Sequence, residues 1–360
     1  MVPLFVAAQL ASATTLHVGP GQQYANITRA VNAAALNDTI VIHAGVYDDQ
    51  ISSYGPLTFV GDGDPVWRNP GNASPLIYAR DGLSITGIIF EGGGRWPCIS
   101  VQPSGFGPLT DVTIDQTTFH RCNSAVYAYE TDLLLTDSVF VDNRSGVYQD
   151  LGQATLTGNV FARNGSSGAM YVRQMLDNRF IDNDGGFQAF VGGGELISGN
   201  TFCNNRAGLY IEQEGNGGGR PSVRVVDNVF IDNQTTALAS AGGVTIENNY
   251  AGPLQMILAN NTFAGNGGSM AAHVLAIDAE VVLVNDIFAR GAAAAGLSVF
   301  GSGTMVGDWN LFYANDAGDL NGLAAASLGA NTLWGVDPMV TSYSRDFDCS
   351  NDDHTPLPGS

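Results

Sequence analysis

The chain has 360 residues and carries 34 acidic side chains against 14 basic ones, for a formal net charge of −20 at pH 7. A surface this acidic disfavours nucleic acid and anionic membranes as partners, because phosphate groups are bound by basic residues. All 14 basic residues are arginine, since the sequence contains no lysine. This excludes mechanisms that use a lysine base, a lysine Schiff base or a phosphate-binding lysine.

The first thirteen residues have the features of an export signal. An apolar run from Val2 to Leu10 is followed by three small residues, 11–13, which is typical of a signal-peptide cleavage site. We therefore expect residues 1–13 to be a signal peptide and the mature protein to be secreted or displayed at the cell surface by bacterial-type export. The alternative is an apolar first strand that remains on the protein. No later segment is long and apolar enough to form a transmembrane helix.

The middle of the chain contains a repeat of about twenty residues. Phenylalanines mark this repeat at intervals of 21, 21, 19 and 22 residues between Phe119 and Phe202. An asparagine usually stands two residues before the phenylalanine, and another stands three residues after it. The repeated phenylalanines are Phe119, Phe140, Phe161, Phe180, Phe202, Phe230, Phe263, Phe288 and Phe312. A period this short predicts a solenoid of strands, because helical repeats need longer units.

Each repeat is expected to form one rung of a parallel β-helix. A short apolar piece such as residues 112–114 precedes each phenylalanine, and a second piece such as residues 209–210 follows each downstream asparagine. Glycine and asparagine at the corners suit tight turns with positive φ. Stacked rungs would bury phenylalanine on phenylalanine, and corner asparagines can form a hydrogen-bonded ladder. We therefore assign these phenylalanines and asparagines to structure and not to catalysis.

Four cysteines, Cys98, Cys122, Cys203 and Cys349, are too few for a disulfide scaffold in a chain of this length. Cys98 and Cys122 lie about one repeat apart and could form a disulfide, or the cysteines could be buried thiols. The sequence has no Cys-x-x-Cys motif, which disfavours a zinc site.

The N-terminal segment adds a specific resemblance. Residues 17–21, His-Val-Gly-Pro-Gly, are followed by Tyr24 and by residues 27–34, whose apolar positions fall at i, i+3, i+4 and i+7. With these motifs and the repeat, the chain resembles the exported right-handed parallel β-helix proteins of the pectate-lyase-like superfamily. The resemblance implies an all-β, single-stranded right-handed β-solenoid over residues 14–320 with an N-terminal amphipathic capping helix. An irregular tail, residues 321–360, would follow and could be truncated.

Alternation within the second strand of each rung predicts an outward-facing strip. Leu209 and Ile211 should point inward, so Tyr210 and Glu212 should point outward. The same phase places these further side chains outside: Tyr127, Tyr129, Tyr148, Asp150, Tyr171, Arg173, Gln188 and Phe190.

A strip of this composition suits a sugar polymer. Aromatic rings stack on the C–H faces of sugars, and carboxylates and arginine bind hydroxyls. We interpret these residues as a candidate substrate-binding surface: Tyr127, Tyr148, Asp150, Tyr171, Gln188, Tyr210 and Glu212. The alternative is a structural stack of aromatic rings that stabilises the parallel sheet.

Two residues are candidate catalytic groups. Arg173 is the only arginine that the predicted phase places on the strip, and it could neutralise a uronate carboxylate in a lyase-type reaction. Ca²⁺ held by Asp150, Glu212 or neighbouring residues could assist. His273 is expected where tyrosines stand upstream and is a candidate general base. A hydrolase pair is not indicated on the strip, because Asp150 and Glu212 lie three rungs apart, roughly 14 Å by strand spacing.

The leading hypothesis is therefore an exported carbohydrate-interacting β-helix protein with a polysaccharide or glycan as its partner. A lyase-type polysaccharide-degrading activity in a groove on the β-helix face would fit this hypothesis, which needs no cofactor beyond the possible Ca²⁺. The competing hypothesis is a non-catalytic structural or adhesin-like surface protein. The sequence gives no indication of the oligomeric state.

Overall fold

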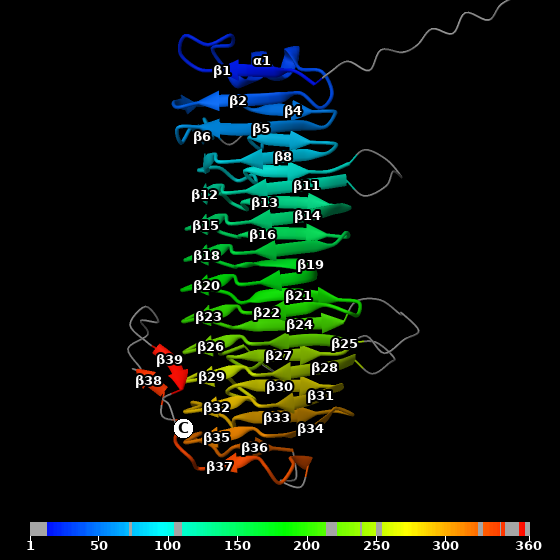
Figure 1. Ribbon diagram of the computed structural model, residues 1–360, viewed down its shortest axis with the longest axis vertical. Helices are drawn as coiled ribbons and strands as arrows, with labels where there is room; N and C mark the ends of the chain where they lie inside the picture. The colour runs from blue at the N-terminus through cyan, green and yellow to red at the C-terminus, as the bar shows by residue number, and fades with distance from the viewer. Residues whose placement is uncertain are drawn as a thin grey trace, which may run out of the picture.

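The computed structural model describes residues 13–71, 74–103, 110–213, 222–237, 240–249, 254–322, 327–338, 340–342 and 353–356. Within these ranges the chain coils into a right-handed parallel β-solenoid whose rungs stack along one long axis (Figure 1). Each full rung visits three parallel sheets in turn, which we call sheets A, B and C. Sheet B has 13 strands, while sheets A and C join into 24 strands because β19 (Gly168–Leu176) belongs to both. The predicted all-β solenoid is thus confirmed.

The strands of each sheet follow one another down the rod. Sheet A contains β1 (Thr15–Val18), β2 (Thr39–His43), β5 (Leu57–Asp62), β8 (Leu83–Thr86), β11 (Thr110–Asp115), β14 (Thr131–Thr136), β17 (Ala154–Thr157), the end of β19, β22 (Leu196–Ser198), β25 (Ser222–Val226), β28 (Leu254–Ala259), β31 (Ala279–Val284) and β34 (Thr304–Asp308). Sheet B contains β3 (Val46–Tyr47), β6 (Val66–Arg68), β9 (Ile89–Glu91), β12 (Thr118–His120), β15 (Val139–Val141), β18 (Val160–Ala162), β20 (Arg179–Ile181), β23 (Thr201–Cys203), β26 (Val229–Ile231), β29 (Thr262–Ala264), β32 (Ile287–Ala289), β35 (Leu311–Tyr313) and β37 (Leu333–Trp334). Sheet C contains β4 (Ile51–Ser53), β7 (Ile77–Ala79), β10 (Ile99–Val101), β13 (Val126–Tyr129), β16 (Val147–Asp150), the start of β19, β21 (Phe187–Val191), β24 (Leu209–Gln213), β27 (Val244–Glu247), β30 (Val274–Ile277), β33 (Leu297–Phe300) and β36 (Leu320–Asn321).

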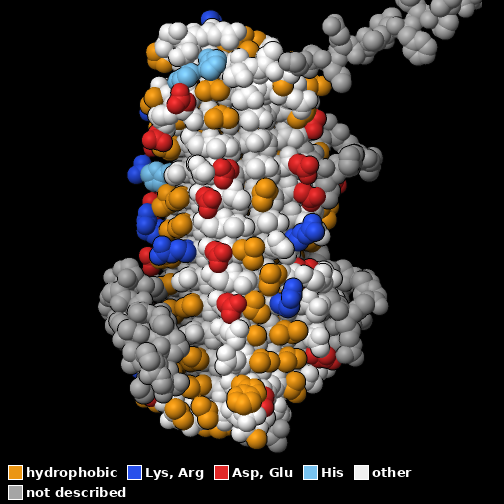
Figure 2. Space-filling view, in the orientation of Figure 1, with side chains coloured by type: hydrophobic (Ala, Val, Ile, Leu, Met, Phe, Trp, Pro, Cys, Tyr) orange, Lys and Arg blue, Asp and Glu red, His pale blue; other side chains and the backbone are white. Residues whose placement is uncertain are grey.

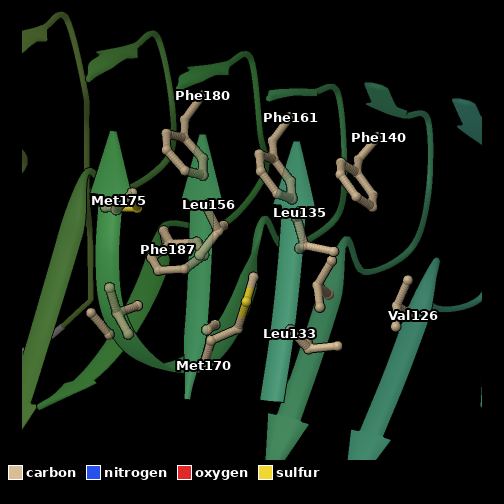
Figure 3. Packing of buried hydrophobic residues seen from close by; sticks show 14 of the residues in the cluster. Val126, Leu133, Leu135, Phe140, Leu156, Phe161, Met170, Met175, Phe180 and Phe187 are labelled. Carbon is tan, nitrogen blue, oxygen red and sulfur yellow. The ribbon is translucent and has the colours of Figure 1, made fainter. Parts of the chain in front are cut away.

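A column of stacked phenylalanine rings runs down the inside of sheet B. From Phe90 to Phe312 the ring centroids of successive rungs lie 4.5–5.1 Å apart. The rings face the aliphatic side chains of sheets A and C, as Figure 3 shows for Phe140, Phe161 and Phe180. Each stacked pair contributes about 0.5–1.5 kcal/mol beyond the burial of its apolar area. The predicted stacking of the repeat phenylalanines is confirmed.

Two ladders of asparagine side chains run along the turns on either side of sheet B. Each Nδ2 donates to the Oδ1 of the next rung at 2.8–3.1 Å. The first ladder, between sheets A and B, contains Asn159, Asn178, Asn200, Asn228 and Asn261, and the second, between sheets B and C, contains Asn164, Asn183, Asn205, Asn233 and Asn266. All of these amides are buried. Because a buried amide needs partners, the ladders explain why asparagine recurs at these corners.

A short helix, α1 (Ile27–Ala33), lies at the N-terminal end of the rod. Asn26 is its N-cap, and its side chain accepts a hydrogen bond from the backbone N–H of Arg29 at 3.0 Å. Ile27 and Ala30 are buried, and the helix packs against β1, β2 and β4. The predicted apolar spacing therefore forms a helix of two turns that contacts the first rungs. The predicted signal peptide lies outside the described residues except for residue 13.

The described part of residues 321–360 contains further strands. β37 pairs with β35, and the ring of Trp334 stacks on Phe312 at 4.7 Å, so the solenoid continues past residue 320. β38 (Val340–Ser342) and β39 (Asp353–Pro356) form a separate antiparallel pair.

One disulfide joins neighbouring rungs. Cys98 precedes β10 and Cys122 precedes β13, and their Cα atoms are 5.6 Å apart in a Cys98–Cys122 disulfide. The Cys98–Cys122 pairing, which the sequence left open, is therefore present. Cys203 is buried at the end of β23, and Cys349 lies outside the described residues.

An aspartate replaces the amide at one rung of the first ladder. Oδ1 of Asp286 accepts hydrogen bonds from the backbone N and the Nδ2 of Asn261 at 2.8 and 2.9 Å. Its Oδ2 is buried without a hydrogen-bond partner among the described residues. Burial raises the pKa of the Asp286 carboxyl to about 7, although the hydrogen bonds from Asn261 act in the opposite direction.

Asp286→Asn should stabilise the protein at neutral pH. The folded state binds the Asp286 proton more tightly than the unfolded chain, whose carboxyl titrates near pH ~4. The free energy of unfolding of the wild type should therefore fall as the pH rises from about 4 to about 7 and stay low above that range. The amide has no charge to bury, so the variant should lose this dependence and gain on the order of 3 kcal/mol above about pH 7. Denaturant unfolding at several pH values measures the effect, and an unchanged pH dependence would contradict it.

Candidate functional site

The outward residues of sheet C form two columns. Tyr127, Tyr148 and Ala169 are register partners in the first column, which continues through Gln188 to Tyr210. The second column contains Tyr129, Asp150, Tyr171, Phe190 and Glu212. The outward orientation predicted for these residues is confirmed. Tyr148 and Tyr171 stand in different columns, because Ala169 is the partner of Tyr148 and Tyr171 pairs with Phe190.

Neighbouring rungs of the strip contact one another. The rings of Tyr127 and Tyr148 are stacked with centroids 5.6 Å apart, and Tyr148 is 41% exposed. Nε2 of Gln188 donates to Oε2 of Glu212 at 2.8 Å. The Tyr210 hydroxyl donates to Glu247, and burial together with this carboxylate raises the pKa of Tyr210 well above its usual range. The side chains of the strip therefore hold one another in place, and Tyr210 stays protonated.

Arg173 does not lie on this strip. The register of β17 against β19 shifts between Ala154 and Thr155, so that β19 has an extra residue at the point where it passes from sheet C to sheet A. Arg173 is this extra residue, because Val172 pairs with Ala154 and Gln174 with Thr155, both on sheet A, and a bulged residue has no register partner. Arg173 is consequently exposed on the face of sheet A, and its predicted place beside Tyr171 on the strip is wrong.

His273 does not lie on this strip either, and it is not exposed. It is fully buried directly before β30, with its ring between Phe263 and Phe288. Its expected position among the outward tyrosines is wrong, because the outward residue of β30 at that register is Leu275, the partner of Thr245. A buried imidazole cannot act on a polymer bound outside the rod, so we do not retain His273 as a catalytic candidate.

The imidazole of His273 fills a gap in the second asparagine ladder. Gly291 occupies the rung where an asparagine would stand, between Asn266 and Asn315. Nδ1 of His273 lies 3.3 Å from Nδ2 of Asn266, and Nε2 lies 2.9 Å from Oδ1 of Asn315. Asn266 Nδ2 is a donor and Asn315 Oδ1 an acceptor, so the ring is neutral with its proton on Nε2. A Cβ on Gly291 would lie 2.9 Å from His273 Nε2, which explains the glycine.

A polar depression on sheet A brings ionisable groups together. Its volume is about 340 Å³, and it is lined by Asp111, Val112, Thr113, Asp132, Leu133, Leu134, Gln153, Thr155 and Arg173. Asp111 and Asp132 are register partners on β11 and β14. Oδ1 of Asp132 accepts the backbone N–H of Gln153 at 2.8 Å. Arg173 forms no ion pair within 4.0 Å among the described residues, so its guanidinium is available to a ligand.

The aspartate pair is not among the predicted site residues. Asp111 and Asp132 are separated by 21 residues, which is one repeat, and each stands directly before an apolar strand piece. This spacing is the sequence signal of the pair, on the first strand of the rung and not on the strand that carries the tyrosines. Figure 2 shows the face of sheet A, with charged side chains over its upper part and hydrophobic side chains gathered over its lower part.

Neither a metal cluster nor a membrane-spanning helix is present in the part of the chain that the structure describes. No three His, Cys, Asp or Glu side chains there are placed to hold a metal ion. The described helix is far too short to cross a bilayer.

Comparison with known proteins places the fold in a family. The model of the family described as "Right handed beta helix region" matches residues 97–332, and the chain belongs to this family. A comparison with curated proteins found no match.

Several solved structures have the same fold at low sequence identity. The complex of XylC with xylose has a TM-score of 0.58 and 11% identity, over 91% of this chain and 87% of that one. The catalytic domain of an α-1,3-glucanase in complex with tetrasaccharides has a TM-score of 0.53 and 12% identity, over 83% and 63%. The A-module of an Azotobacter vinelandii mannuronan C-5 epimerase has a TM-score of 0.47 and 15% identity, over 86% and 91%.

His273→Ala should destabilise the protein. The change leaves Asn266 and Asn315 without their bridging partner and opens a cavity, which should cost about 3 kcal/mol. His120 is a half-buried histidine on sheet B that pairs with Asp142 at 3.4 Å, and His120→Ala serves as the control with a cost below about 1 kcal/mol. Denaturant unfolding measures both variants. Equal stability of His273→Ala and the wild type would show that the bridge has no structural role.

Proposed function

We propose that this protein interacts with a polysaccharide along the face of sheet A and that the polar depression is the principal site. The observation that carries the proposal is the grouping of Asp111, Asp132 and Gln153 around Arg173, whose guanidinium has no ion-pair partner among the described residues. The volume of about 340 Å³ is within the range of small-ligand sites. Membership of the right-handed β-helix family, and a saccharide-bound structural neighbour with a TM-score of 0.53, support the proposal.

The groups in the depression suit an uncharged sugar chain. Asp111 and Asp132 accept hydrogen bonds from hydroxyls, and Arg173 and Gln153 donate to ring and hydroxyl oxygens. Leu134 is 40% exposed between the polar groups and provides an apolar contact for a C–H face. Two carboxylates against one guanidinium, on a chain of net charge −20, disfavour a polyanionic polymer.

Cleavage of the bound chain is a second candidate function, which the aspartate pair favours. Adjacent strands bring Asp111 and Asp132 to within a strand spacing of about 4.8 Å at the backbone. Glycoside hydrolysis uses two carboxylates, and negative charge stabilises its oxocarbenium-like transition state. The lyase-type reaction expected from the sequence would instead use Arg173, with Ca²⁺, to neutralise a uronate. Because the site has an excess of carboxylates, we propose hydrolysis in preference to elimination.

Asp132→Asn and Arg173→Ala should each weaken polysaccharide binding about tenfold or more, since each removes a charged hydrogen-bonding partner. Isothermal titration with xylan, dextran and alginate, with and without Ca²⁺, measures binding. Asp137→Asn is the matched control, because Asp137 follows β14 on the same face at a turn with φ 46°, which asparagine also adopts.

The same three polysaccharides also distinguish hydrolysis from elimination and a site on sheet A from one on sheet C. New reducing ends indicate hydrolysis, and absorbance of an unsaturated uronate indicates elimination. Binding that depends on Tyr148 and not on Asp132 would transfer the site to the strip on sheet C. Absence of binding to every polymer in the panel would favour the structural or adhesin-like protein and contradict the proposal.

A further inference from the structure

Trp309 is an unusual residue at its position in the rung. It follows β34, at the turn between sheets A and B, and has a φ of 63°. The corresponding turn residues with positive φ in the rungs above are Gly87, Gln116, Asp137, Gly158, Asp177, Gly199, Asp227, Asn260 and Asn285. Trp309 is 62% exposed, so its indole ring does not contribute to the core. A tryptophan in this left-handed conformation costs on the order of 1 kcal/mol that glycine or asparagine would avoid.

The backbone that carries Trp309 is held in place. Oδ1 of Asp308 accepts the N–H of Trp309 at 2.9 Å and the N–H of Asn331 at 3.0 Å. Oδ2 of Asp308 accepts from Nδ2 of Asn331 at 2.8 Å. The hydrogen bond from the Asn331 side chain is the main reason why the pKa of the Asp308 carboxyl lies below its usual value. Asp308 is therefore charged at neutral pH. An exposed aromatic ring is thus displayed from a fixed turn, and the strain there is not relieved by packing.

Trp309 stands at the end of the same face that contains the depression. From Leu134 the central outward position continues by register through Thr155, Gln174, Leu196 and Arg224 to Ile257, Val282 and Val306, so it is mostly polar in the middle and aliphatic over the last three strands. Val284 and Val306 are 39% and 50% exposed, and Figure 2 shows hydrophobic side chains gathered at this lower end. Seven strand steps separate β14 from β34, which is about 34 Å.

The aliphatic side chains at this end of the face have a polar border on one side. The outward residues two positions earlier on the same strands are Gln255, Glu280 and Thr304, which are register partners of one another. On the other side Val284, two positions after Val282, is also outward and apolar. Aliphatic side chains with hydrogen-bonding groups along one edge, and an exposed indole ring at the adjoining turn, match the apolar face and hydroxyl rim of sugar rings.

We propose that Trp309 is a stacking platform for a sugar ring of a long polysaccharide that also occupies the depression. This inference rests on the proposed function and adds a distal binding position to it. Val284 and Val306 lie on β31 and β34, next to the turn that carries Trp309. A long chain would contact both the depression and Trp309, whereas a tetrasaccharide in the depression is too short to reach Trp309.

Trp309→Asn separates a binding role from a structural one. Asparagine suits the φ of 63°, so the melting temperature should stay equal to that of the wild type or rise. Affinity for each polysaccharide of the panel that the wild type binds should fall about fivefold to tenfold, while affinity for the matching tetrasaccharide should not change. Trp96→Asn is the control, because Trp96 is also exposed but lies between β9 and β10, away from sheet A.

Other results would overturn the inference in distinguishable ways. If the wild type binds no polysaccharide, both the proposed function and the platform are wrong. If the wild type binds and Trp309→Asn binds equally well, the platform alone is wrong. A lower melting temperature in Trp309→Asn would show that the indole ring stabilises the folded protein by packing. If sedimentation shows that the wild type is an oligomer and Trp309→Asn is a monomer, the outer face of sheet A contacts a second copy of the chain.

Discussion

Every rung of this protein depends on the next one to satisfy the polar groups of its turns. An asparagine Oδ1 in the ladders accepts both the backbone N–H and the amide Nδ2 of the preceding rung. Such amides are buried, so a missing partner would cost the full penalty of desolvation. The same in-register stacking places ring on ring in sheet B. The ladders and the phenylalanine column therefore enforce one register along the rod, and that register fixes which side chains share a face.

The exceptions in the ladders show what a rung requires. Asp286 can accept the two hydrogen bonds from Asn261, but it has no proton to give when ionised, and its second oxygen stays unsatisfied. Gly291 supplies no side chain at all, and His273 reaches in from the adjoining strand start to supply one acceptor and one donor. The ladder thus accepts a different residue when the pattern of donors and acceptors is preserved. At Asp286 the pattern is broken, and burial raises the pKa of this carboxyl.

The outer surface is under no such constraint, and the proposed binding site lies there. Sheet C presents tyrosines and carboxylates that bind to one another across rungs. Sheet A presents an aspartate pair with an available guanidinium around β11 and β14 and an exposed tryptophan directly after β34. Because rungs stack at a fixed spacing, such a face positions groups along a straight line, as a linear polymer requires. The rigid interior keeps these groups aligned without a ligand.

The sequence by itself determined the interior. The period of about twenty, the phenylalanines and the asparagines all face inward or form the corners, where identical residues must stack, so their repetition is visible in one chain. The tertiary structure decided the surface. Arg173 is the extra residue of a bulge where β19 enters sheet A, the imidazole of His273 fills the space left at Gly291, and strand pairing places Asp111 beside Asp132. The bulge and the vacant ladder position depend on local register and leave no periodic signal in a sequence, whereas the aspartate pair does repeat at the rung period.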